Sequence, residues 1–113
     1  MAKYMVLYYS TMSASQLMAN ASMEQMKASM IEWQKWKDNA SKTAKIEFGM
    51  PLEAVRHITS DGPTDSASKI SGYSIVEGDS KEAIVELLRT HPHLKRAGAS
   101  IDLLEMISMP GLK

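Results

Sequence analysis

The sequence predicts a small α+β domain in which two helices cover one face of an antiparallel sheet. Three observations predict it: short apolar runs rich in β-forming residues, two stretches with apolar residues at helical spacing, and their order along the chain. That order is strand, helix, strand, strand, helix, strand, the ferredoxin-like βαββαβ layout. The length of 113 residues suits a single domain over residues 1–113.

The first half of the chain supplies a strand and the main helix. Tyr4 to Tyr9 is apolar on both faces, as in a strand of a sheet covered on both sides. Ser10 to Ala21 is small and polar, and we expect a loop there with room for one short helical turn. A helix is expected over Ser22 to Ser41, because Ser22 and Gln25 have the spacing of a capping box. Its buried stripe is expected to comprise Met23, Met26, Met30, Trp33, Trp36 or Lys37, and Ala40.

The middle of the chain is expected to form two short strands and a loop. Ala44 to Phe48 is one strand, which stops before Pro51 because proline cannot donate to a ladder. Ala54 to Thr59 is the next, and we expect the two to pair as a hairpin. Asp61 to Ser66 is dense in turn-forming residues and is expected to be a loop.

The last third supplies a strand, a helix and a strand. Gly72 to Glu77 is a strand with strong β-formers. The second helix is expected over Ser80 to Arg89, with Asp79 and Glu82 as a possible capping pair, and it ends before Pro92. Ile101 to Ile107 is the last strand.

Composition narrows the class of protein. Thirteen basic and thirteen acidic side chains cancel, which gives no basic face for nucleic acid and no attraction to an anionic membrane. The absence of cysteine excludes disulfides and thiolate metal sites, and is compatible with the cytoplasm. No apolar stretch reaches the roughly 18 residues of a membrane span. We therefore expect a cytoplasmic protein that binds neither nucleic acid nor membrane.

The strands are apolar on both faces, although two helices can cover only one. Neighbouring apolar pairs occur at Val6 and Leu7, at Ile75 and Val76, and at Leu103 and Leu104. A second copy of the chain is the simplest cover for the remaining face, so we expect a homodimer. The alternative is that the terminal segments fold over it.

Three polar residues are the candidate catalytic groups. His57, in a predicted strand, could be a general base, because the pKa of histidine is near neutrality; the alternative is an exposed or interface histidine. Asp61 could orient a histidine or act as an acid, or could only cap a turn. His93 is a candidate for the lining of a cavity. We interpret His91 as a residue at the C-terminal end of a helix.

Three further side chains are candidates for substrate binding, and no cofactor is expected. Trp33 and Trp36 could stack on an aromatic ligand or could fill the core, and the Ser74 hydroxyl could orient a ligand. His91 and His93 have no carboxylate nearby at ligand spacing, so we expect no metal site. Because there is no glycine-rich phosphate loop, we expect no nucleotide cofactor.

Several short motifs follow one another along the chain: Lys3 to Tyr9, Trp33-Gln34-Lys35-Trp36, Gly49-Met50-Pro51-Leu52, Asp61-Gly62-Pro63, Gly72-Tyr73-Ser74-Ile75, Ala83, His91-Pro92-His93-Leu94, Ala99-Ser100-Ile101-Asp102 and Met109-Pro110-Gly111. Taken in this order, they resemble the YCII-related family, also called DGPF-type proteins. The resemblance implies a dimeric α/β barrel in which two ferredoxin-like sheets pack face to face. Some relatives are implicated in dehydrochlorination or related lyase steps on small ring compounds, and the wider superfamily includes monooxygenases and isomerases.

The chain departs from this family in two places. Thr64 follows Asp-Gly-Pro, where phenylalanine is typical, and the first long helix lacks the histidine that some members pair with an aspartate. Two functions are therefore weighed. The first is an enzyme, lyase-like or isomerase-like, that acts on a small ring-containing metabolite in a cavity between sheet and helices. The second is a non-catalytic module for small-molecule binding or dimerisation.

Overall fold

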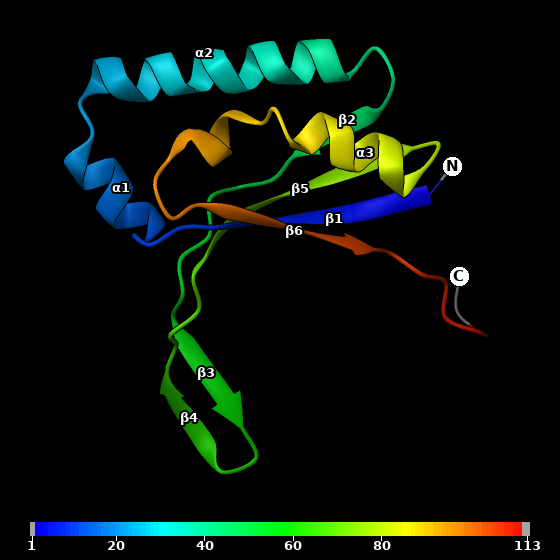
Figure 1. Ribbon diagram of the computed structural model, residues 1–113. Helices are drawn as coiled ribbons and strands as arrows, with labels where there is room; N and C mark the ends of the chain where they lie inside the picture. Colours follow the sequence, from blue (N-terminus) through cyan, green and yellow to red (C-terminus); the bar gives the residue numbers. More distant parts are fainter. Residues whose placement is uncertain (1, 112–113) are drawn as a thin grey trace.

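The computed structural model describes residues 2–111 and shows a four-stranded antiparallel sheet with helices on one face, together with a separate two-stranded sheet (Figure 1). The strand order is β2-β5-β1-β6. This order is compatible with a ferredoxin-like fold, and the predicted α+β class with an antiparallel sheet is confirmed. The four strands are β1 (Ala2–Tyr9), β2 (Lys45–Phe48), β5 (Ile70–Gly78) and β6 (Ser100–Glu105).

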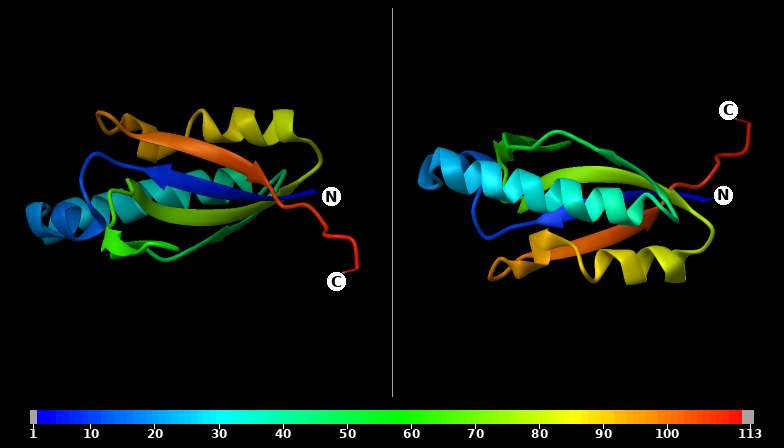
Figure 2. Two further views of the ribbon diagram at one scale, coloured as in Figure 1. Left: turned by 90° about the horizontal axis from the view of Figure 1, so that it is seen from below. Right: turned by 90° about the horizontal axis from the view of Figure 1, so that it is seen from above.

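The two predicted helices are present and lie over the same face of the sheet (Figures 1 and 2). Helix α2 (Met23–Ala40) begins at Ser22, and Ser22 and Gln25 form the predicted capping box. Helix α3 (Lys81–Leu88) is capped by Ser80, whose Oγ accepts a hydrogen bond from the Ala83 amide. The cap therefore lies one residue later than the predicted Asp79. A 3₁₀ helix, η1 (Pro92–Lys95), follows α3.

The segment before α2 is more regular than the sequence suggested. Residues 14–20 form a helix, α1 (Ala14–Asn20), where a loop with one turn was expected. Ser13 and Gln16 form a second capping box, with the same spacing as the one that opens α2. Only Ala14 of this helix is buried, so the weak apolar periodicity hid it.

The predicted pairing of the two middle strands is wrong. Strand β2 pairs with β5, whereas β3 (Arg56–Thr59) pairs with β4 (Gly62–Asp65) in a hairpin of its own. The expected loop after Asp61 is thus mostly strand, and the turn is confined to Ser60 and Asp61. Gly62 follows this turn with φ of +119°, a conformation that favours glycine.

The helix-facing side of the sheet forms the core. In β1, alternate residues Tyr4, Val6 and Tyr8 point to this side and are buried. They pack with Val76 and Ile46 of the sheet and with side chains of α2 and α3, namely Trp36, Ala40, Ile84 and Leu88. The prediction that Met23 and Met30 belong to the buried stripe of α2 is wrong, because these side chains are 68% and 71% exposed.

The opposite side of the sheet, which we call the open face, is also apolar. Its centre consists of one side chain from β6, Leu104, and two each from β1 and β5. Met5 lies between Ile75 on one neighbouring strand and Leu104 on the other. The ring of Tyr73 lies directly over Gly49, where an added Cβ would come within 2.3 Å of it. The five residues are Met5, Leu7, Tyr73, Ile75 and Leu104.

Candidate functional site

A cluster of aromatic and polar side chains lies between the sheet and α2. Tyr8 comes from β1 and Ser74 from β5, and both face the helices. His91 and His93 come from the turn after α3, where Pro92 opens η1. Trp33 and Trp36 project from α2. All six except Trp33 are buried, and His91 is 1% exposed. We call these six residues the aromatic–histidine cluster.

Hydrogen bonds in the cluster fix the protonation of His91. The backbone N–H of His93 donates to His91 Nδ1 at 3.0 Å, so the proton of the neutral ring is on Nε2. His91 Nε2 therefore donates to the Tyr8 hydroxyl at 3.1 Å. The Tyr8 hydroxyl is also hydrogen-bonded to Ser74 Oγ at 2.7 Å. The result is a hydrogen-bonded network of His91, Tyr8 and Ser74 across the core.

Burial keeps His91 and Tyr8 of this hydrogen-bonded network uncharged. Desolvation, with a smaller contribution from nearby His93, lowers the pKa of His91 to about 3. Burial raises the pKa of Tyr8 to about 12, although the hydrogen bond to Ser74 opposes the shift. Both residues are therefore neutral near pH 7. A neutral His91 carries no positive charge that could complement the dipole at the C-terminal end of a helix.

His93 ties the turn after α3 to the first strand. Its Nε2 lies 2.9 Å from the Tyr9 carbonyl oxygen, and because a carbonyl only accepts, the imidazole donates. Burial lowers the pKa of His93, while the carbonyls of Tyr9 and Ser100 oppose the shift. The predicted cavity-lining residue is thus a buried link between η1 and β1.

Aromatic rings fill the space around the two histidines. The ring of His91 lies 4.3 Å from Trp36 and 4.5 Å from Trp33 between centroids, and Tyr8 lies 5.0 Å from Trp33. Trp36 Nε1 also donates to the Leu87 carbonyl at the end of α3 at 3.0 Å. These contacts match close core packing.

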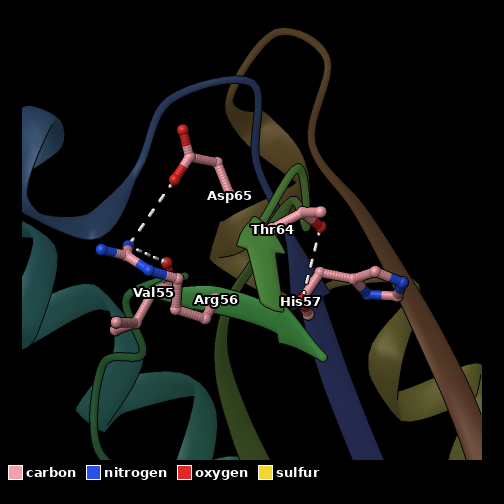
Figure 3. A network of polar contacts seen from close by, with 5 residues as sticks. All are labelled: Val55, Arg56, His57, Thr64 and Asp65. Atoms are coloured by element: carbon pink, nitrogen blue, oxygen red, sulfur yellow. Dashed lines mark hydrogen bonds and ion pairs between the residues drawn. The ribbon is translucent and has the colours of Figure 1, made fainter. Parts of the chain in front are cut away.

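The structure separates the predicted catalytic residues. His57 and Asp61 lie on the β3–β4 hairpin and are exposed, whereas His93 is buried under α2. In Figure 3 the His57 ring points away from the Arg56–Asp65 ion pair, whose charged atoms are 3.7 Å apart. Ser74, Trp33 and Trp36, the predicted substrate-binding residues, do come together, in the aromatic–histidine cluster.

Sequence reasoning missed Tyr8 and His91 as members of this cluster. The alternation along β1 could have found Tyr8, because it shares a face with Tyr4 and Val6. His91 carries no such signal, since its burial depends on how the turn after α3 meets α2.

A cavity of about 210 Å³ lies elsewhere, at the base of the hairpin. It is lined by the loop after β1, the start of α1 and the chain on both sides of the hairpin, including Ser10, Glu53 and Lys69. Among residues 2–111, no three histidine or carboxylate side chains gather closely enough to hold a metal ion. Within the same residues, no helix is long and apolar enough to cross a membrane. No known protein-family model matches the chain, and no curated protein sequence matches it.

Proposed function

We propose that this chain is an assembly domain that pairs with a second copy through the open face of its sheet. The proposed assembly is the dimeric α/β barrel of the YCII-related family, which the sequence motifs resemble. One observation carries the proposal. The centre of the open face is apolar in three adjacent strands, at Met5, Leu7, Tyr73, Ile75 and Leu104.

The surroundings of this apolar centre suit an interface. Charged residues lie around it: Lys3 pairs across the strands with Glu77, and Leu7 pairs with Asp102. Lys45 on β2 forms an ion pair with Glu77 at 3.9 Å. An apolar centre with a polar rim is the usual anatomy of a protein interface. A two-fold axis through the face brings the same patch of both copies together.

The described C-terminal segment leaves the open face available. Strand β6 ends at Glu105, and beyond it Ile107 is 83% exposed and Met109 62% exposed. In Figure 1 this segment runs out past the end of the sheet. These exposures favour a second copy over the alternative that the terminal segments cover the face.

The test of assembly is the mass of the protein in solution. We expect the wild type to sediment as a dimer and Ile75→Asp to sediment as a monomer, because a buried carboxylate at the interface centre is strongly unfavourable. Met30→Asp is the matched control, since Met30 is exposed on α2 and lies on the other side of the molecule. It should remain dimeric. A wild type that is monomeric up to high micromolar concentration would contradict the proposal.

A second candidate function is an enzyme or binding protein for a small ring-containing compound. The observation in its favour is the convergence of Ser74, Tyr8, His91 and His93 in one place, with strongly shifted pKa values at Tyr8 and His91. A planar ligand would have to displace Trp33, the most accessible member. The catalytic roles of His57 and Asp61 stay predictions, because both lie outside this cluster.

Intrinsic fluorescence tests this second candidate directly. The chain has two tryptophans, and both belong to the aromatic–histidine cluster. Titration with a panel of small aromatic and alicyclic acids should give a saturable change in emission if a ligand enters. Ser74→Ala should weaken that change, while His57→Ala should not. No saturable change from any compound would argue against the second candidate and leave the assembly domain.

A further inference from the structure

The β3–β4 hairpin is separate from the main sheet. It spans residues 56–65 and hydrogen-bonds as an independent two-stranded sheet. Figure 1 shows it on the side of the sheet opposite the helices, which is the side of the open face. Every residue in it is exposed except Gly62, which is half-buried.

Both apolar side chains of the hairpin, those of Ile58 and Pro63, lie on one of its two faces. In its register Ile58 lies opposite Pro63, and Arg56 lies opposite Asp65. Alternation places these four side chains on one face, with Ile58 and Pro63 next to the turn. His57 lies opposite Thr64 on the other face. Ile58 is nonetheless 75% exposed, so its apolar surface has no cover within the described chain.

Such a hairpin has little reason to be stable by itself. An isolated two-stranded hairpin is at best marginally stable in water. The Arg56–Asp65 ion pair adds little, because its side chains are 59% and 98% exposed. A regular two-stranded hairpin outside the main sheet is therefore expected to rest against another surface.

The length of the hairpin indicates which surface that is. Four residues per strand, at about 3.3 Å each, extend roughly 13 Å from the base. Two sheets that pack face to face lie about 10 Å apart. A second sheet on the open face therefore lies within reach of the hairpin. The C-terminal segment of the same chain leaves from the opposite end of the sheet (Figures 1 and 2).

We infer that the β3–β4 hairpin is an arm that packs its Ile58–Pro63 face against the second copy. The inference rests on the proposed dimer and goes beyond it, because each copy would then hold the other through a segment outside the sheet. The arm also gives a reason for the exposed side chain of Ile58, which lies on a strand outside the core.

Two matched variants test the arm. Ile58→Asp places a carboxylate on the face that carries Ile58 and Pro63, and Thr64→Asp places the same group on the opposite face of the same hairpin. Both native side chains are exposed within one copy, so neither change removes a core contact. We expect Ile58→Asp to raise the dimer dissociation constant by about tenfold or more, and Thr64→Asp to leave it nearly unchanged. Sedimentation velocity over a dilution series measures both.

Amide hydrogen exchange gives a second measurement on the unmodified protein. We expect the amides of residues 56–65 to be protected at concentrations where the dimer forms and to exchange fast on dilution to the monomer. Amides of β1 and β5 report that the sheet stays folded. Fast exchange in the hairpin of a dimer, or equal dimer affinity of Ile58→Asp and the wild type, would overturn the arm. Either result leaves the dimer itself standing, whereas a monomeric wild type removes both proposals.

Discussion

The two faces of the sheet are built from the same strands but have opposite physical character. On the helix-facing side the Tyr8 hydroxyl is buried and hydrogen-bonded, and its pKa is raised to about 12 mainly by burial. Tyr9, the next residue, lies on the open face, where the carboxylate of Asp102 is the main cause of its raised pKa. One side is thus a filled, uncharged core, and the other is an apolar surface rimmed by charge.

This difference shows why residue type alone does not locate a functional site. The histidine on the hairpin and the two histidines after α3 have the same chemistry in the sequence. Burial turns His91 and His93 into parts of the core, whereas His57 stays at the surface. Variants on the two sides should therefore differ in kind: those in the core change stability, and those on the open side change association.

The largest effect is expected from removing the ring at the centre of the core. Trp36→Ala loses the contacts with His91 and the hydrogen bond to the Leu87 carbonyl. We expect the free energy of unfolding to fall by about 3–5 kcal/mol, measured by urea denaturation. Met30→Ala, on the exposed face of the same helix, should change it by less than about 0.5 kcal/mol. Equal losses of stability in Trp36→Ala and Met30→Ala would contradict the packing of α2 described above.

Acid should destabilise the protein through His91. The pKa of His91 is about 3 when folded, below its ordinary value of 6.5, so the unfolded chain binds the proton first. Its contribution to stability is fully present above pH 6.5 and is lost as pH falls toward 3, with a slope of up to about 1.4 kcal/mol per pH unit. His91→Gln cannot titrate and should show a shallower pH dependence of stability. Parallel curves for the two proteins would contradict the assignment.

A smaller effect is expected from a single hydroxyl group. Tyr8→Phe leaves His91 Nε2–H and Ser74 Oγ without their shared partner in a buried place. We expect a loss of about 1–3 kcal/mol in the free energy of unfolding. Tyr9→Phe, the neighbour on the open face, is the matched control and should cost less. Thermal and urea unfolding at one protein concentration compare the two, because the proposed dimerisation would also affect apparent stability.

The smallest effect is expected on the hairpin. His57→Ala removes an exposed ring that faces away from the ion pair in Figure 3. The free energy of unfolding should stay within about 0.5 kcal/mol of the wild type. A larger loss, measured by urea denaturation, would place His57 in a contact with the proposed second copy or with another part of the chain.

Local signals predicted most of the regular elements. The Ser22–Gln25 capping box fixed the start of α2, and Pro92 fixed the end of the second helical stretch. The same spacing occurs at Ser13 and Gln16, where α1 begins, although this short helix has no apolar stripe and only one buried residue. Which strands pair was harder to predict from local sequence. Two successive strands favour a hairpin locally, but β2 pairs with β5 because its single buried residue, Ile46, completes the core beside Val76.

The sequence by itself determined the fold class, the main helices and the apolar character of both sides of the sheet. Periodicity and capping are local properties, so neighbouring residues suffice to express them. Only the tertiary structure decided that His57 and Asp61 lie apart from His93. It also decided that Tyr8, Ser74 and His91 form one uncharged hydrogen-bonded network. Those relations join residues more than sixty positions apart, and they depend on strand register and on how the turn after α3 meets α2.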